Sequence, residues 1–150
     1  HDNTQKIRLA GRYDRTVTYY QQLRHYGKIG DRFTAGGWCS SFAKKNDPDN
    51  SVYCRITVQF TSADPVTDKS YWATGGSAVF NAEEGNWQFA SAGIIAPNNC
   101  TYIRVVLQMN RQMNFADFTG IYLYPEAFGT QYIYDKNGNR KTRKMLYGEL

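Results

Sequence analysis

Two segments of the sequence repeat one set of side chains whose types suit the binding of a polar ring compound. Each set holds a tyrosine, an arginine and a glutamine in the same order: Tyr53, Arg55 and Gln59, then Tyr102, Arg104 and Gln108. A tyrosine ring offers a flat apolar face, and guanidinium and amide groups form hydrogen bonds with hydroxyls. Sugars present apolar C–H faces and hydroxyls, so these side chains suit a glycan. The alternative is that they are ordinary solvent-facing residues that form cross-strand pairs.

Three tryptophans are further candidates for stacking on a ligand. We add Trp38 to the candidate binding residues because it follows a glycine pair in a predicted strand. Trp87 lies beside Gln88 and Phe89 and is predicted to be part of the core. Trp72 lies in a polar segment that reads as a loop, where an exposed ring would be informative.

The sequence offers little for catalysis. His25 lies between Arg24 and Tyr26 and is expected at the surface, without a nucleophile motif beside it. The adjacent pair Glu83-Glu84 is predicted to form a turn, because neighbouring carboxylates point apart and do not flank a glycosidic bond. The sequence contains no GxxxxGK[ST], GxSxG or HExxH motif. We therefore expect a protein that is not an enzyme.

The three cysteines, Cys39, Cys54 and Cys100, do not have the spacing of a zinc site. Each lies in an apolar strand pattern, where a cysteine behaves as a small hydrophobic residue. Buried free thiols are therefore expected, and a disulfide between Cys39 and Cys54 in an oxidising compartment is the alternative.

Period-two alternation predicts the strands that must position these residues. In residues 52–60 every second residue is apolar, which predicts one buried face and one wet face that carries the first Tyr/Arg/Gln set. Residues 102–109 repeat the pattern with Ile103 and its alternate neighbours inward. Less regular strands are expected at 16–23, 33–43, 77–80, 87–89 and 120–124, with Gly36-Gly37 marking a bulge or a weak point. Short strands with frequent turn signals predict an all-β fold, a β-sandwich of two antiparallel sheets.

Composition limits the classes of partner. The chain has 150 residues, a net charge of +5 and a mean hydropathy of −0.62, and no apolar run long enough for a membrane span. From Asp135 onward the chain has five basic and two acidic residues, so the tail carries 5 − 2 = +3 of the net charge. The remaining +2 is too weak a field to predict a nucleic-acid surface, although the tail could bind an anionic polymer. The first residues lack a signal-peptide pattern, which is typical of a mature or excised piece.

Two stretches resemble a known kind of bacterial module. Residues 28–38 read KIGDRFTAGGW and resemble the Gly-Asp, aromatic, small, Gly-Trp strand of jelly-roll domains similar to carbohydrate-binding modules of the galactose-binding-like kind. Residues 118–124, FTGIYLY, are followed by FGTQYIYDKNGN at 128–139. This second stretch resembles the junction at which such a domain meets the Tyr-Asp (YD, or Rhs-type) repeats of large bacterial surface proteins and toxin shells.

The resemblance implies a fold, a role and a location. It implies a jelly-roll domain over residues 1–125, a tail over 126–150 that begins a YD repeat, and a bacterial protein that is secreted or on the cell surface. A glycan and the rest of the parent YD-repeat protein are the implied partners. Related modules often carry a calcium-binding Asp where this sequence has Thr119, so no cofactor is expected; Asp117 is the only nearby substitute.

We therefore expect a non-catalytic carbohydrate-binding module that binds no nucleic acid. The competing hypothesis is a structural or adhesive protein-interaction spacer that keeps the fold without a sugar site.

Overall fold

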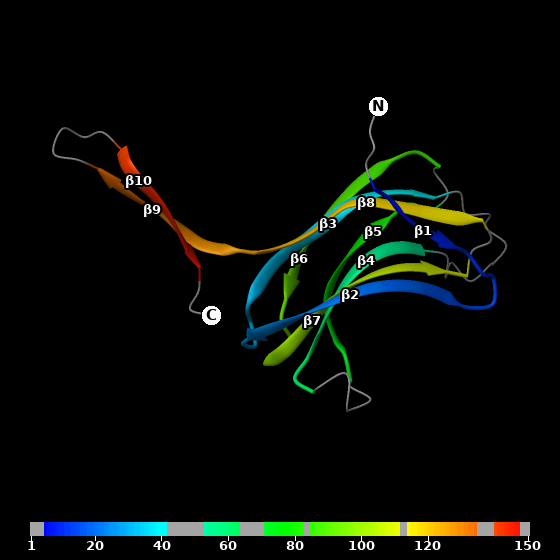
Figure 1. Cartoon of the computed structure of the whole chain (residues 1–150), viewed down its shortest axis with the longest axis horizontal. Coiled ribbons are helices and arrows are strands. Elements are labelled where there is room, and N and C mark those ends of the chain that lie inside the picture. The colour runs from blue at the N-terminus through cyan, green and yellow to red at the C-terminus, as the bar shows by residue number, and fades with distance from the viewer. Residues whose placement is uncertain are drawn as a thin grey trace.

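The fold is all-β and contains no helix in the part of the chain that is described. The computed structural model describes residues 5–41, 53–63, 71–82, 85–111, 114–134 and 140–147. For residues 127–134 and 140–147 it describes the backbone alone. The strands, labelled in Figure 1, are β1 (Ile7–Ala10), β2 (Thr16–Gly27), β3 (Arg32–Ser41), β4 (Tyr53–Thr61), β5 (Ala73–Phe80), β6 (Gln88–Ile95), β7 (Cys100–Asn110), β8 (Phe115–Pro125), β9 (Ala127–Tyr134) and β10 (Arg140–Tyr147). None of these segments is a helix that could cross a membrane.

Two four-stranded antiparallel sheets form the sandwich, in the orders β1-β8-β3-β6 and β2-β7-β4-β5. Strands that follow one another in the chain mostly lie in different sheets, so the chain crosses repeatedly between the layers. This is the jelly-roll arrangement, and it confirms the predicted fold class.

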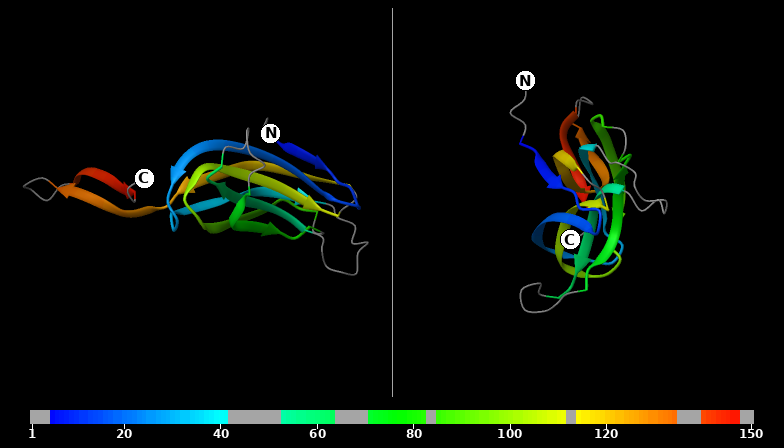
Figure 2. Two further views of the ribbon diagram at one scale, coloured as in Figure 1. Left: turned by 90° about the horizontal axis from the view of Figure 1, so that it is seen from below. Right: turned by 90° about the vertical axis from the view of Figure 1, so that its right-hand side faces the viewer.

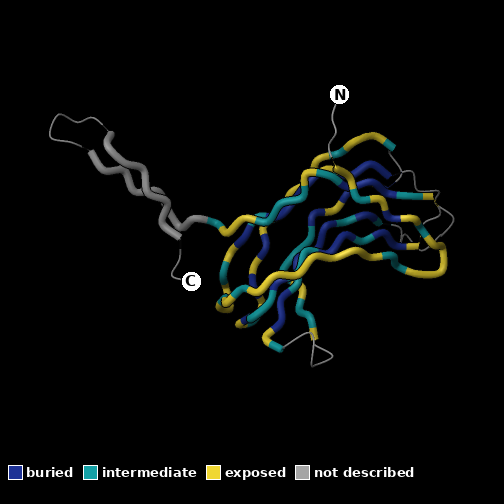
Figure 3. The backbone as a smooth tube through the Cα atoms, viewed as in Figure 1, coloured by how far each residue is buried: buried dark blue, intermediate teal, exposed yellow. Residues whose placement is uncertain are grey.

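The core lies between the sheets and follows the predicted alternation. The inward side chains of β4 are fully buried: Cys54, Ile56, Val58 and Phe60. Those of Ile103, Leu107 and Met109 on β7 are at most 2% exposed. In Figure 3 these buried stretches run through the interior, whereas β2 is exposed along most of its length. The outward side of β4 and β7 is less exposed than predicted, since Thr57 and Val106 are also buried.

A bulge occurs at the predicted glycine pair. Between β3 and β8 the register shifts, so that Gly120 and Ile121 lie opposite the single residue Gly37. Gly120 has a φ of +59°, the left-handed conformation that a glycine adopts in this type of bulge. The predicted irregularity at Gly36-Gly37 is therefore a bulge whose extra residue lies on β8, while β3 pairs with β6 without a break.

Several predictions of extent were wrong. β5 and β6 are longer than the predicted 77–80 and 87–89, and β1 was not predicted. Trp87 is not part of the core: it is 47% exposed, and its neighbour Phe89 is 52% exposed. Both rings lie on the outer side of β6, whose inner side carries the smaller residues Ala90 and Ala92.

β8 ends at Pro125, and a separate two-stranded antiparallel sheet of β9 and β10 follows. Figure 2 shows this hairpin beyond one end of the sandwich. The Asp135 to Asn139 part of the predicted YD core lies outside the described residues.

Candidate functional site

The outer surface of the β2-β7-β4-β5 sheet, here called the arginine face, brings together six of the seven predicted site residues. The register pairs Arg55 with Gln108 and Gln59 with Arg104, because β4 and β7 run antiparallel. Tyr102 lies two residues from Arg104 on the same side, and Tyr53 two residues from Arg55. The repeated order of the two sets therefore places each arginine opposite the glutamine of the other set.

Hydrogen bonds hold both arginines across the strands. Arg55 donates from Nε to Oε1 of Gln108 at 2.6 Å, and Arg104 donates from Nε to Oε1 of Gln59 at 2.8 Å. Thr57 donates to the same Gln108 oxygen at 3.0 Å. Because each guanidinium is anchored through Nε, its two terminal nitrogens remain available for a further acceptor; no described residue bonds to them.

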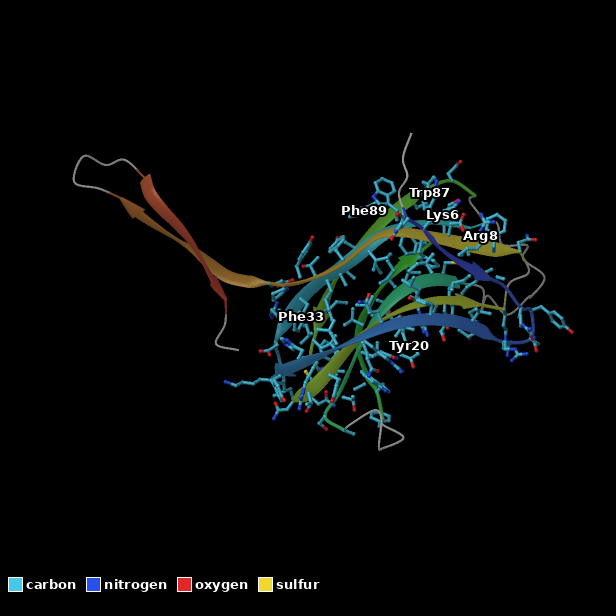
Figure 4. The ribbon with its side chains drawn as sticks, viewed as in Figure 1. Lys6, Arg8, Tyr20, Phe33, Trp87 and Phe89 are labelled. Carbon is cyan, nitrogen blue, oxygen red and sulfur yellow. The ribbon has the colours of Figure 1, made fainter. Side chains whose placement is uncertain are left out.

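Arg104 is held between two aromatic rings. Its guanidinium carbon lies 4.2 Å from the Trp72 ring centroid and 5.3 Å from that of Tyr20. Tyr20 projects from β2 on the side of the sandwich opposite to Trp87 and Phe89 (Figure 4) and is 53% exposed. Partial burial lowers the pKa of the Arg104 guanidinium, and the nearby Tyr20 offsets only part of this.

Two more arginines on this face also stack on tyrosines. The guanidinium carbon of Arg55 lies 4.2 Å from the Tyr53 ring centroid, and that of Arg24 lies 5.2 Å from the Tyr26 centroid. Arg24 is opposite Tyr102 in the β2–β7 register, so it shares the face with Arg104. Each arginine therefore has an aromatic neighbour, which orients the guanidinium without neutralising it.

The structure places Trp38 away from the other six predicted residues. Trp38 lies on β3, in the other sheet, and is 44% exposed. It belongs to what we call the aromatic ladder, four rings on the outer surface of the β1-β8-β3-β6 sheet: Trp38, Phe89, Tyr122 and Tyr124. Successive ring centroids are 5.4, 6.3 and 5.2 Å apart.

Sequence reasoning missed Tyr20 and Arg24 as members of the arginine face, and it named Trp72 as a stacking candidate without connecting it to this face. Tyr20 and Arg24 lie in a predicted strand, but their side of the sheet follows only from the pairing of β2 with β7. Trp72 carried a usable signal, a tryptophan in a polar segment, and the structure finds it half-buried and stacked on Arg104.

A cleft of about 270 Å³ opens between the sheets on the side where β2 faces β8. Its lining includes Tyr19, Leu23, Val105 and Ile121, and it holds no charged side chain. It explains why the inner residues of β2 are exposed. The lining is mostly apolar, and Gln21, Tyr19 and Tyr122 are its polar side chains.

Asp117, the only predicted substitute for a calcium ligand, is already neutralised by two cations. Arg8 donates to both carboxylate oxygens at 2.7 and 2.8 Å, and Lys6 donates at 3.1 Å. These bonds lower the pKa of the Asp117 carboxyl, and the bond from Arg8 has the largest effect. Thr119 donates to the carbonyl of Gln5 at 3.1 Å. Both side chains would have to give up these partners to ligate an ion, and no cluster of three acidic, histidine or cysteine residues occurs among the residues described.

The three cysteines are buried free thiols, as expected. Cys39 on β3 and Cys54 on β4 meet across the interior. A hydrogen bond between the two thiols raises the pKa of the Cys39 thiol, and burial raises it further. A protonated, enclosed thiol is a poor nucleophile.

No protein-family model matches the chain, and no curated protein does. Solved structures do resemble it. "Family 16 Carbohydrate Binding Module-2" aligns with a TM-score of 0.50 and 18% identity over 77% of this chain and 73% of that one. The CBM22-1 and GH10 modules of Clostridium thermocellum endo-1,4-beta-D-xylanase 10B, complexed with xylohexaose, align with a TM-score of 0.50 and 12% identity over 77% of this chain and 20% of that one.

A third similar structure is the enzymatically active domain of tailspike protein 4 of bacteriophage CBA120. The TM-score is 0.54 and the identity 7%, over 74% of this chain and 14% of that one. At these identities the comparisons establish the jelly-roll fold of the chain.

Proposed function

We propose that this chain is a non-catalytic carbohydrate-binding module and that the arginine face is its binding surface. The observation that carries the proposal is Arg104, held between Tyr20 and Trp72 with its Nε bonded to Gln59. An exposed ring can stack on the apolar face of a sugar while the terminal guanidinium nitrogens and nearby amides bond its hydroxyls.

The fold supports this proposal in a general way. Two of the similar structures carry the words carbohydrate-binding module or its abbreviation in their names, and one of them holds a xylo-oligosaccharide. Jelly-roll sheets present wide regular faces on which side chains from neighbouring strands converge. The arginine face is such a surface, with polar groups from four strands.

Binding to a panel of neutral and acidic soluble polysaccharides tests the proposal. Affinity electrophoresis would compare the wild type with Tyr20→Ala and Trp72→Ala, and titration calorimetry would give affinities. We expect each variant to bind about tenfold more weakly, equivalent to about 1.4 kcal/mol of lost ring contact. Trp38→Ala is the matched control, because it removes an exposed ring from the opposite sheet.

Two results would contradict the proposal. One is that no polysaccharide of any charge retards the wild type at millimolar sugar concentration. The other is that Trp38→Ala loses binding while the two arginine-face variants keep it. Thermal unfolding of each variant shows whether the fold is intact.

The alternative function is a protein-interaction spacer, and the aromatic ladder is the observation that favours it. Phe89, Tyr124 and Trp38 expose large apolar rings on one sheet surface, and such patches are typical of contact surfaces. A spacer predicts that the ladder variants change self-association or partner binding in sedimentation while no glycan binds.

We also propose the wider setting that the sequence resemblance implies. In that setting the module belongs to a secreted or surface protein, and the β9–β10 hairpin is the start of a YD repeat. Expression of the chain with the residues that follow it in its parent protein tests this: the hairpin amides should gain protection from hydrogen exchange when the next repeats are present.

A further inference from the structure

The arginine face is positively charged in a way that hydroxyl recognition alone does not require. It carries Arg24, Arg55 and Arg104. The acidic residues among those described lie elsewhere: Asp14 beside Arg15, Asp31 at the turn after β2, Asp117 under Arg8 and Lys6, and Glu126 beside Thr34. Within the described ranges, none of the three arginines forms an ion pair.

The guanidinium groups are oriented for an anion. Arg55 and Arg104 each use Nε to bond a glutamine on the adjacent strand, which leaves the fork of terminal nitrogens for an acceptor outside the sheet. An arginine fork matches the two oxygens of a carboxylate or sulfate. Because the rings of Tyr53, Tyr20 and Trp72 already fix the planes of these groups, little side-chain freedom is lost on binding.

The partial burial of Arg104 also favours an anionic ligand. Taking a guanidinium out of water costs free energy unless an anion compensates. In the sheet, Arg104 has two rings and a neutral amide as neighbours. An anionic ligand would supply the missing compensation.

The spacing of the arginines indicates an oligomer with more than one acidic group. Arg104 is opposite Gln59, four residues along β4 from Arg55. At about 3.3 Å per residue and about 4.8 Å between strands, the two Cα atoms are about 14 Å apart. Each guanidinium is also bonded to the glutamine directly across from it, which keeps the two groups at separate positions along the sheet. A chain with repeated acidic sugars can pair with both.

We infer that the ligand of the arginine face is an acidic polysaccharide, whose carboxylate or sulfate groups pair with Arg104 and Arg55 while its sugar rings stack on Tyr20. This inference rests on the proposed carbohydrate-binding function. It narrows the substrate class to anionic glycans and assigns Arg24 a supporting role beside Arg104.

Matched pairs of polymers test the inference on the full chain. Polygalacturonate and its methyl ester differ in carboxylate charge, and dextran sulfate and dextran differ in sulfate charge. We expect at least one acidic member to bind about tenfold or more tightly than its neutral counterpart, and the affinity to fall steeply between about 50 and 200 mM salt. The two pairs distinguish carboxylate from sulfate as the recognised group.

Variants locate the charge that matters. Arg104→Gln and Arg55→Gln should each weaken acidic-polymer binding about tenfold, because each removes a charged fork. Arg12→Gln is the matched control, since it removes the same charge from an exposed residue outside the face. A double variant, Lys141→Gln with Arg143→Gln, tests the basic tail; both controls should bind within about twofold of the wild type, as expected for distant surface charges.

The results that overturn the inference differ from those that overturn the proposed function. Equal binding of neutral and acidic members refutes the acidic class but keeps carbohydrate binding. Equal losses from Arg104→Gln and Arg12→Gln, or a loss confined to the tail variant, refute the arginine face as the source of selectivity. Tighter binding of an oligothymidine than of any acidic polysaccharide refutes the sugar class altogether.

Discussion

Gly36 lies at a point in the β1-β8-β3-β6 sheet where a side chain does not fit. A Cβ placed there would lie 2.4 Å from the carbonyl oxygen of Ala90, 2.7 Å from the Tyr122 hydroxyl and 2.9 Å from the Cα of Ser91. The tyrosine tip can move, but two of the three neighbours are backbone atoms of a strand paired to β3. Gly36→Ala must therefore push β6 away from β3 or break their pairing.

The cost of this substitution can be estimated from overpacking elsewhere. Insertion of a methyl group into a packed site costs about 1–3 kcal/mol. For a domain of this size about 2 kcal/mol lowers the midpoint of thermal unfolding by roughly 4–8 °C. Circular dichroism would follow thermal unfolding, and urea titration at constant m-value would give the change in unfolding free energy.

Gly93 provides the control on the adjacent strand β6. A Cβ at Gly93 meets no atom within 4 Å. Gly93→Ala should therefore leave the unfolding free energy unchanged or raise it by up to about 1 kcal/mol, because alanine lowers the conformational entropy of the unfolded chain. If Gly36→Ala unfolds together with the wild type and with Gly93→Ala, the close approach of β6 to Gly36 is refuted.

Two further predictions concern buried groups. Asp117→Asn should lower the unfolding free energy by about 1–2 kcal/mol at neutral pH, because the carboxylate bonds to Arg8 and Lys6 are lost. The folded-state pKa of Asp117 is depressed, so its contribution to the unfolding free energy is complete above the unfolded carboxyl pKa and is lost as the pH falls through the folded pKa. The unfolding free energies of the wild type and Asp117→Asn should therefore converge in acid. A constant difference between them down to pH 2 would contradict the ion-pair account. The Cys39 thiol, buried and with a raised pKa, should react with a thiol reagent only in denaturant, and rapid labelling in the native state, measured by mass spectrometry, would contradict its enclosure.

The sequence predicted the parts of the fold in which chemistry and periodicity agree. Residues 54–60 alternate between apolar and polar, and residues 103–109 do so except at Val106. Their buried side could therefore be read directly, and with it the shared direction of Arg55 and Gln59. The pairing of strands could not be read, because a period of two fixes the side of a residue but not its neighbour. The partners of Arg104 therefore came only from the register of β2, β4 and β7.

Strand β6 shows why the assignment of Trp87 to the core was wrong. Trp87, just before the strand, and Phe89 lie on its outer side, whereas its inner side carries Ala90, Ala92 and Ile94. The bulkier apolar residues thus face outward, and a rule that buries the more hydrophobic side selects the wrong one. Small inner residues suit β6, because Ala90 and its neighbours lie against Gly36 and Gly37 on β3.

The cations on the two outer surfaces of the sandwich have different partners. On the β1-β8-β3-β6 sheet, Arg8 and Lys6 converge on the buried carboxylate of Asp117, and the protein neutralises its own charge. On the arginine face the cations stack on rings and bond neutral amides, and the described part of the chain supplies no anion. Folding stability alone favours the first arrangement, because an unpaired, partly desolvated cation is a cost. The second arrangement, which Arg55 and Arg104 share, is explained if the compensating anions arrive on a ligand.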